Sequence, residues 1–429
     1  MIDEKLEQSE PLSPVVSEVE AKILAGNFGT PVFGYSQDIL EEQANKALAF
    51  PNAYGITVRY AMKANSNSNI LRIFDQVGLH IDASSGYEAE RAIKAKILPG
   101  KISLTSQLIP GNGRKLIEQG VNYVACSLDQ LEWYGKFFPN SDVSVRINPG
   151  KGSGGTKRTN TGGPSSSFGI WHEEIPEVLT ILKKYGLNMT RYHSHIGSGS
   201  DPKVWKKVAF MNLENILKFI KAGHNINTAN FGGGYKVGRM SYEKSTDLQE
   251  CGEPIKQAFV DFAKQTGVEL KLEIEPGTFL VANAGALVSR VVDVKSTPKY
   301  KFLITDAGMP EITRPALYGA QHPISIVQVF KSFKKECYIV SGKCCESGDI
   351  LTPAKTNPEK LQPRLLPEAV VGDLVVIGGA GAYCSGMCTK NYNSYPEAAE
   401  VLIDKEDGIR LIRERQTLEQ MTQNEIAVV

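Results

Sequence analysis

Five short segments of the sequence carry groups that could act together on a small molecule. They contain Lys63 (YAMKAN), Asp82 (HIDASS), His195 (HSHIGSG), Gly232–Gly234 (FGGGY) and Glu275 (EIEPG). A lysine of lowered pKa can form a Schiff base with a carbonyl compound. Successive glycines let backbone N–H groups approach a phosphate, and a carboxylate can keep a ring nitrogen protonated. The combination predicts a site for a phosphorylated ring that carries a carbonyl group.

Each of these groups also has a simpler structural interpretation when it is taken alone. Lys63 at a strand end would extend its ammonium group into solvent, and three glycines after a strand would form a tight turn. Glu275 could equally cap a helix, and His195 could be a hydrogen-bonded buried histidine. Their joint occurrence favours pyridoxal phosphate, which needs a lysine, a phosphate cradle and a carboxylate partner for its ring nitrogen.

The elements that would position these residues alternate between strands and helices. Segments with i, i+3, i+4 apolar spacing separate short β-type runs, which lie at 57–64, 80–85, 102–107, 123–128, 143–148, 191–197, 228–234 and 270–276. This alternation predicts an α/β fold with right-handed βαβ units and a parallel sheet. A closed (β/α)8 TIM-type barrel fits these runs better than an open doubly wound sheet, which stays an alternative. Barrel chemistry lies at the C-terminal strand ends, where the five segments fall.

The alternation of strand and helix patterns ends at about residue 285. Short β-rich runs with Gly and Pro turns follow, at 286–294, 301–306, 336–341, 374–377 and 400–403. Another strand pattern, at 30–35, precedes the barrel. We therefore predict a barrel at 37–284 and a discontinuous β-sandwich or barrel-like domain from 1–36 and 285–429. The residues after Arg413 would form a helical or frayed tail.

Composition and charge exclude several classes of protein. Lys and Arg total 48 against 47 Asp and Glu, for a net charge of +1, which argues against a nucleic-acid partner. Apolar runs stay short of the roughly 18 residues of a membrane span, and the polar start MIDEKLEQSEPL is unlike a signal peptide. Seven scattered cysteines suit a reducing cytoplasm and lack the paired spacing of a zinc site, so we expect a cytoplasmic protein without a metal.

The sequence resembles the fold-type III pyridoxal-phosphate decarboxylases, and within them the diaminopimelate decarboxylases. The similarity runs from about Thr30 to Ile403 and rests on motifs that occur in order. These are YAMKAN, D-x-x-S-x-x-E, HSHIGSG, FGGGY, EPG, RPALYGAQHPI, CCESGD and AGAYCSGMCTKNYNS. The resemblance implies a barrel with a β-domain, an amino-acid substrate, and a homodimer with active sites shared between subunits.

The resemblance also implies how the cofactor would be held. Lys63 would bind it covalently, His195 would pack on its ring and Glu275 would pair with its ring nitrogen. The other cofactor contacts would come from Asp82, Ser198, Gly232, Gly233, Gly234, Gly277 and Tyr383.

Substrate contacts are implied in the same way. Arg314 and Tyr318 would bind a carboxylate, and Tyr383 would lie near both phosphate and substrate. Cys345 and Glu346 would come from the second subunit. Glu346 would bind the distal ammonium group, and Cys345 would be the proton donor, with Lys63 as its competitor.

The predicted reaction is the decarboxylation of meso-2,6-diaminopimelate to L-lysine, the last step of lysine biosynthesis. One departure from the family pattern concerns the substrate, because the arginine that usually follows EPG is Thr278 here. Losing a charge-assisted hydrogen bond removes about 1.5–3 kcal/mol unless another group replaces it. Possible replacements are Arg146, Lys151, Lys157 and Arg158.

Two alternatives therefore stay open. Thr278 keeps open a decarboxylase for another amino acid, such as D-lysine, D-ornithine or a siderophore-type intermediate. A non-catalytic carrier of pyridoxal phosphate is the alternative from another class. It is disfavoured by the motifs RPALYGAQH, CCESGD and AGAYCSGM, because such carriers typically lack the second domain.

Overall fold

The computed structural model describes residues 15–152, 161–197 and 201–428. The chain forms two compact units. The barrel unit comprises Glu41–Val237 and Ser245–Leu280, and the β-unit comprises Met1–Leu40, Gly238–Lys244 and Val281–Val429. The domain boundaries predicted from the sequence stay a prediction.

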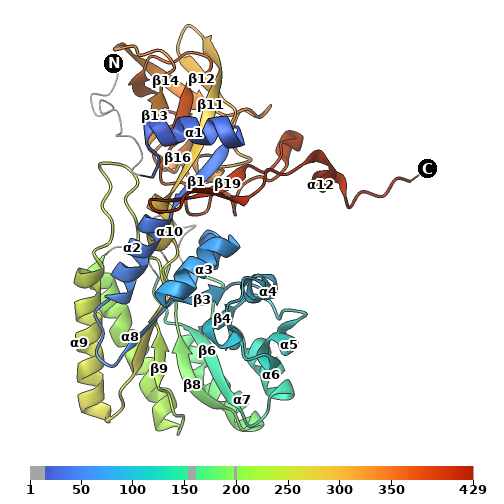
Figure 1. The fold of residues 1–429 in the computed structure, drawn as a ribbon. Coiled ribbons are helices and arrows are strands. Elements are labelled where there is room, and N and C mark those ends of the chain that lie inside the picture. The colour runs from blue at the N-terminus through green and yellow to red at the C-terminus, as the bar shows by residue number, and fades with distance from the viewer. Residues whose placement is uncertain (1–14, 153–160, 198–200, 429) are drawn as a thin grey trace. The chain divides into compact units, whose positions relative to one another are not determined.

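The barrel unit is built on parallel strands (Figure 1), and their pairing forms a closed ring. Its strands are β2 (Ile56–Ala61), β3 (His80–Ala83), β4 (Ile102–Thr105), β5 (Asn122–Ala125), β6 (Asp142–Asn148), β8 (Asn188–His193), β9 (Thr228–Asn230) and β10 (Lys271–Ile274). Each strand pairs in parallel with the next, and pairing of β10 with β2 closes the ring. The predicted (β/α)8 barrel is confirmed, with all eight predicted runs at barrel strands. The short β7 (Ile170–Trp171) adds to β6.

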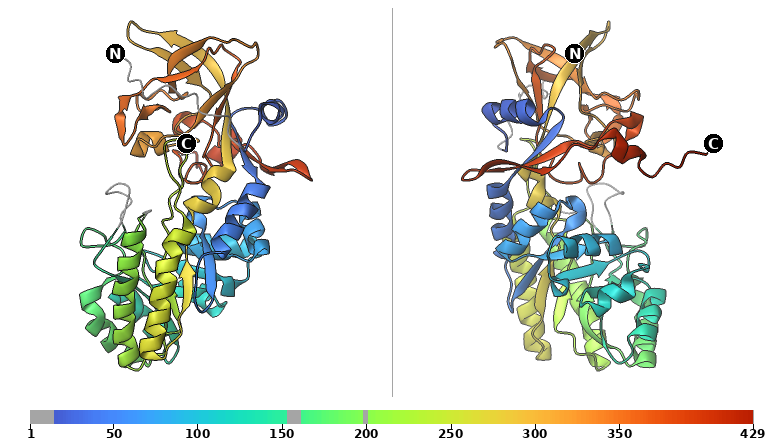
Figure 2. Two further views of the ribbon diagram at one scale, coloured as in Figure 1. Left: turned by 90° about the vertical axis from the view of Figure 1, so that its left-hand side faces the viewer. Right: turned by 45° about the vertical axis from the view of Figure 1, so that its right-hand side comes forward.

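One helix precedes the first barrel strand, others connect the successive strands, and a short one follows the last strand (Figures 1 and 2). They are α2 (Gln37–Leu48), α3 (Ser68–Val77), α4 (Gly86–Lys94), α5 (Gly113–Glu118), α6 (Leu128–Phe137), α7 (Ile175–Tyr185), α8 (Pro202–Lys221) and α9 (Leu248–Thr266), with α10 (Thr278–Val281) after β10. The helix α3 illustrates how local sequence sets the start, the buried face and the end of these helices. It begins at the Asn67 cap, buries Ile70, Leu71, Ile73 and Phe74, and ends at Gly78 with φ of 105°. This apolar spacing turns one helical face toward the sheet.

The β-unit contains a mixed nine-stranded sheet (Figure 1). Its strands are β1 (Val32–Ser36), β11 (Gly285–Ser296), β12 (Lys301–Thr305), β13 (Ile324–Val327), β14 (Lys335–Ser341), β17 (Arg364–Pro367), β18 (Leu374–Ile377), β19 (Ala399–Asp404) and β20 (Gly408–Arg413). The strand β1 pairs antiparallel with β11 and parallel with β19. This confirms that the N-terminal strand belongs to the β-rich part. A two-stranded sheet of β15 (Pro353–Ala354) and β16 (Asn357–Leu361) lies beside it, and α11 (Arg314–Tyr318) and α12 (Leu418–Thr422) complete the unit.

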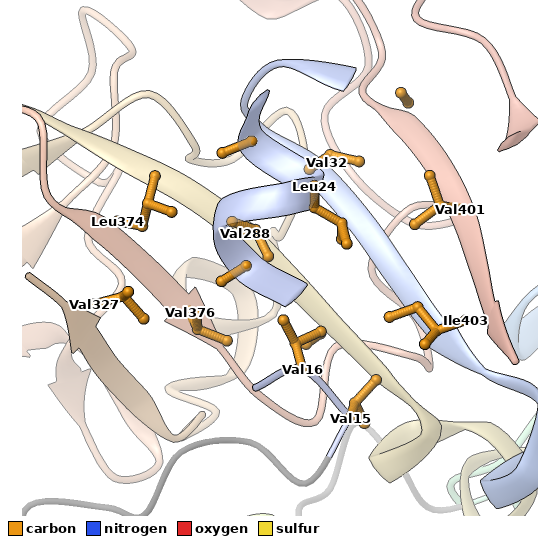
Figure 3. Close-up of a cluster of buried hydrophobic side chains, with 14 residues drawn as sticks. Val15, Val16, Leu24, Val32, Val288, Val327, Leu374, Val376, Val401 and Ile403 are labelled. Carbon is orange, nitrogen blue, oxygen red and sulfur yellow. The ribbon is translucent and has the colours of Figure 1, made fainter. Parts of the chain in front are cut away.

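A helix that the sequence reading did not predict closes the core of the β-unit. The helix α1 (Glu18–Phe28) begins with a capping box, in which Ser17 and Glu20 bond each other's backbone N–H groups. Leu24 of α1 packs with Val32 of β1 and Val288 of β11 in one buried cluster (Figure 3). Helix α1 thus covers the sheet at β1 and β11.

A buried charge network fills the interior of the barrel. Glu273 on β10 accepts hydrogen bonds from Arg59 Nη2 at 2.8 Å and from Arg191 Nε at 2.6 Å, and Arg191 Nη1 donates to Ser103 Oγ at 3.1 Å. Burial opposes the charge of Glu273, but Arg191 and Arg59 outweigh it and hold its pKa at about 2. A buried carboxylate of this kind stays ionised because cations and hydrogen-bond donors replace its hydration.

The described residues were also compared with what a membrane-spanning helix, a disulfide bond or a metal site would require. Within them, no helix combines the length and apolarity needed to cross a membrane. All seven cysteines are free thiols. Among these same residues, no cluster of three or more His, Cys, Asp or Glu side chains could bind a metal ion.

Replacing Glu273 by Gln should destabilise the protein in a pH-dependent way. At neutral pH the variant leaves Arg59 and Arg191 without their carboxylate, at a cost of about 3–5 kcal/mol. The folded-state pKa of Glu273 is about 2 against an ordinary value of 4.5. Its contribution is therefore complete above pH 4.5 and is lost as the pH falls toward 2.

Urea unfolding of wild type and variant at a series of pH values measures this effect. We expect the difference in unfolding free energy to shrink between pH 4.5 and 2. Glu253→Gln is the control, because the Glu253 side chain is exposed and pairs with Lys256 at 3.5 Å, a contact worth less than about 1 kcal/mol. A difference in unfolding free energy between wild type and Glu273→Gln that is equal at all pH values would contradict the proposed role of the Glu273 charge.

Candidate active site

Lys63 lies in a short turn at the C-terminal end of β2. The turn is the 3-10 helix η2 (Met62–Ala64), and the Lys63 side chain is exposed. Tyr60 Oη donates to the carbonyl of Asn65 at 2.8 Å, and the N–H of Ala61 donates to the carbonyl of Pro276 at 3.1 Å. These bonds fix the turn from both sides and join it to the EPG segment.

Glu275 follows β10 directly and is buried, with 7 % of its surface exposed. Its Oε1 accepts a hydrogen bond from Asn230 Nδ2 at 2.6 Å, and both carboxylate oxygens lie 3.2 Å from His193 Nε2. Burial opposes ionisation of Glu275, but His193, together with the positive charge of Arg191, outweighs it and holds its pKa well below the usual range. Burial also lowers the pKa of His193, so its ring is neutral and acts through its Nε2–H group.

Asn230 connects this carboxylate to the charge network beneath it. Asn230 Nδ2 also lies 3.2 Å from Glu273 Oε2, and Asn230 Oδ1 accepts from the N–H of Gly232 at 2.8 Å. Arg59 and Arg191 supply most of the hydrogen bonds to Glu273, so the strongest bond of Asn230 goes to Glu275. The sequence reading did not identify His193 or Asn230. The signal for His193 was its i, i+2 spacing from His195 in a strand.

His195 and the glycine turn pack directly against each other. His195 Nδ1 accepts a hydrogen bond from the N–H of Gly233 at 3.0 Å, so the hydrogen of the neutral ring is on Nε2. Burial, followed by Arg146 and Lys63, lowers the pKa of His195 well below its usual value.

The turn requires glycine for steric reasons. Gly232 has φ of 71°, and a Cβ on it would lie 2.3 Å from His195 Nδ1. A Cβ on Gly233 would lie 1.9 Å from the carbonyl oxygen of Glu275. Side chains here would separate the histidine from the strand end that carries the glutamate.

Asp82, near the end of β3, lies in the same mouth of the barrel. It is 4 % exposed, and its Oδ1 atom has no hydrogen-bond partner among the described residues. Burial, reinforced by Glu275, raises the pKa of Asp82 above its usual range, although Lys63 opposes the shift. In D-x-x-S-x-x-E, the last two residues cap α4, because Ser85 Oγ accepts from the N–H of Glu88 at 3.1 Å.

Of the other predicted barrel residues, some lie within the described residues and some lie outside them. Gly277 packs closely on β2, since a Cβ there would lie 3.3 Å from the Ala61 Cβ. Thr278 begins α10. Ser198, Lys157 and Arg158 lie outside the described residues.

In the β-unit, the structure brings Arg314 and Tyr318 together on one short helix. They are the first and last residues of α11, and the Arg314 guanidinium lies 6.0 Å from the Tyr318 ring centroid. Tyr383 follows β18 in a left-handed conformation, with φ of 56°.

Cys345 and Glu346 lie on an exposed loop of the β-unit. The N–H of Cys345 donates to Asn393 Oδ1 at 2.9 Å, and Tyr392 Oη donates to Glu346 Oε2 at 3.3 Å. Among the described residues, we find no interaction that joins this loop to Arg314, Tyr318 or Tyr383. The loop base is held by a buried ion pair between Lys343 and Glu311 at 2.8 Å.

The barrel residues fit the chemistry of pyridoxal phosphate. They offer a primary amine at Lys63, a fixed and ionised carboxylate at Glu275, and a glycine turn at Gly232–Gly234. The Oδ1 atom of Asp82 is a further buried polar atom without a partner in the described chain. A ligand that brings its own donor to Asp82 would satisfy that atom.

Comparison with known proteins identifies the relatives of this chain. Residues 37–282 match the family described as pyridoxal-dependent decarboxylase, pyridoxal binding domain. The diaminopimelate decarboxylase of Escherichia coli K12 is 34% identical over 407 residues, covering 93% of this chain and 94% of its own.

Solved structures agree with this similarity. A crystal structure of a diaminopimelate decarboxylase has a TM-score of 0.88 at 34% identity, covering 95% of this chain and 97% of its own. The Helicobacter pylori diaminopimelate decarboxylase complexed with L-lysine has a TM-score of 0.83 at 28% identity, covering 94% and 98%. Together with the barrel and its glutamate, lysine and glycine groups, these similarities show that the chain belongs to the diaminopimelate decarboxylase family of pyridoxal-phosphate-dependent carboxy-lyases.

Proposed function

We propose that this protein decarboxylates meso-2,6-diaminopimelate to L-lysine and CO2, as the last step of lysine biosynthesis. The observation that carries the proposal is the buried, ionised Glu275, which Asn230 and His193 hold at the barrel mouth that also contains Lys63. The substrate is proposed because the relatives that match over nearly the full chain are diaminopimelate decarboxylases.

The proposed roles follow from the groups at the barrel mouth. Lys63 binds pyridoxal phosphate through its amine, Glu275 holds the proton on the ring nitrogen, and the neutral His195 packs on the ring. Gly232–Gly234 receives the phosphate, and Ser198, Gly277, Asp82 and Tyr383 complete the set of contacts. The bound cofactor supplies an electron sink for the electron pair that remains when the α-carboxylate leaves.

Glu275 also favours decarboxylation over racemisation. A carboxylate at the ring nitrogen keeps the nitrogen protonated, which strengthens the electron sink. A cation there would leave the sink weaker. The two hydrogen bonds to Glu275 make this charge a fixed feature of the barrel.

In the β-unit, we propose that Arg314 and Tyr318 bind the distal carboxylate and that Glu346 binds the distal ammonium group. A site that pairs a distal carboxylate rejects analogues lacking it by about 10^4–10^5. Thr278 supports the second candidate, a decarboxylase for D-lysine, D-ornithine or a siderophore-type intermediate. The free thiols suit a cytoplasmic location.

A substrate panel tests the proposed activity. Purified protein with pyridoxal phosphate is incubated separately with meso-diaminopimelate, D-lysine, D-ornithine, L-lysine and L-ornithine, and CO2 release and product chirality are measured. We expect CO2 and L-lysine from meso-diaminopimelate alone. CO2 mainly from a diamino acid with one carboxylate would overturn the substrate and favour the second candidate.

We further propose a homodimer in which Cys345 and Glu346 complete the partner's site. Their exposed loop supports this proposal, because within the described β-unit nothing ties the loop to Arg314 or Tyr318. Cys345 then protonates the carbon that loses CO2, with Lys63 as the competing donor.

Mixing two inactive variants tests the shared site. Lys63→Ala and Cys345→Ala are unfolded together, refolded and assayed. Because half of the dimers would be mixed and each mixed dimer would have one intact site, we expect about a quarter of wild-type activity. Each variant refolded alone is the control. Full activity of Cys345→Ala alone, or no recovery in the mixture, would contradict the proposed role.

A further inference from the structure

Arg239 is a cation of the β-unit to which neither the sequence motifs nor the proposed function gives a role. It lies in the segment Gly238–Lys244, which belongs to the β-unit although it follows the glycine turn in sequence. Glu243 Oε2 accepts a hydrogen bond from the backbone N–H of Arg239 at 2.9 Å. The backbone on which this arginine stands is therefore fixed.

The side chain of Arg239 is also fixed, along the turn that follows β18. Its Nε donates to the carbonyl of Gly379 at 3.0 Å. A Cβ on Gly379 would lie 2.9 Å from Arg239 Cγ, and Gly379 has φ of 61°. The glycine therefore leaves the space that the arginine stem occupies, as expected where a side chain must pass close to a backbone turn.

The guanidinium group of Arg239 makes no ion pair among the described residues, where Glu243 acts on it only as a minor electrostatic cause, and its buried Nη2 atom has no hydrogen-bond partner there. The Nε atom of Arg314 is buried and unpartnered in the same part of the chain. Burial lowers the pKa of Arg239 to about 9, and the next largest cause is the charge of Arg314. Two neighbouring cations with unused N–H donors destabilise each other until an anion binds.

The other buried groups near the two arginines do not provide that anion. His322 is 1 % exposed, and its Nδ1 lies 3.0 Å from the carbonyl of Gly378, so it donates from Nδ1. Burial, then Arg239 and Arg314, lowers its pKa well below the usual value, and the ring is neutral. Cys384 remains a thiol, because burial raises its pKa to about 11 despite both arginines.

We propose that Arg239 and Arg314 together bind the distal carboxylate of the substrate, so that Arg239 is a second specificity-determining arginine. The proposal rests on the proposed function. Two guanidinium groups match the two oxygens of a carboxylate, and each charge-assisted bond is stronger than a neutral one. With Thr278 in place of the family arginine, Arg314 is the one arginine among the predicted substrate-binding residues. Arg239 would add a second cation.

Binding of the product tests this role without depending on turnover. Calorimetry measures the affinity of the holoenzyme for L-lysine, which keeps the distal carboxylate, and for cadaverine, which lacks it. In Arg239→Gln we expect L-lysine affinity to fall about 10- to 100-fold while cadaverine affinity is unchanged. The KM for meso-diaminopimelate should rise by a similar factor. Arg239→Lys should recover part of the loss.

Lys244→Gln is the matched control, because it removes one positive charge from an exposed position of the same segment. Wild-type melting temperature and cofactor absorbance in Arg239→Gln would exclude misfolding as the cause. Equal L-lysine affinity in Arg239→Gln and Lys244→Gln would overturn the proposal, as would weaker affinity for pyridoxal phosphate with unchanged L-lysine binding. If wild type neither decarboxylates meso-diaminopimelate nor binds L-lysine, the proposed function itself fails.

Discussion

The buried negative charge of Glu275 is the constraint on which the barrel site depends. A carboxylate removed from water is unfavourable unless hydrogen-bond donors replace its hydration. Asn230 and His193 supply those donors. Asn230 is available because Arg59 and Arg191 already neutralise Glu273 one layer deeper. The ionised state of Glu275 at the mouth of the barrel thus depends on the pairing of Glu273 with Arg59 and Arg191 in the interior.

The β-unit presents the opposite electrostatic situation. The charge of Arg314, after burial, lowers the pKa of Arg239, and neither arginine has an ion-pair partner among the residues that the structure describes. A fixed anion in the barrel suits a protonated ring nitrogen, whereas paired cations in the β-unit suit a substrate carboxylate.

The sequence predicted the elements that have a clear repeating pattern of apolar residues. It missed the elements that lack such a pattern. All eight barrel strands were found, because short β-type runs alternate with segments of helical apolar spacing. Helix α1 was missed although Ser17 and Glu20 form a capping box, and the short strands β13, β17 and β20 lack a long pattern. Arg239 could not be identified from its neighbours in sequence, because its significance comes from Gly379 and Arg314, which are far away along the chain.

The protonation state of the cofactor's ring nitrogen tests the central role of Glu275 most directly. Pyridoxal phosphate labelled with ¹⁵N at the ring would be bound to wild type and to Glu275→Gln, and its nitrogen chemical shift followed by NMR from about pH 6 to about pH 9. We expect a protonated nitrogen throughout this range in wild type and loss of that proton in Glu275→Gln. An unprotonated ring nitrogen in the wild-type protein would contradict it.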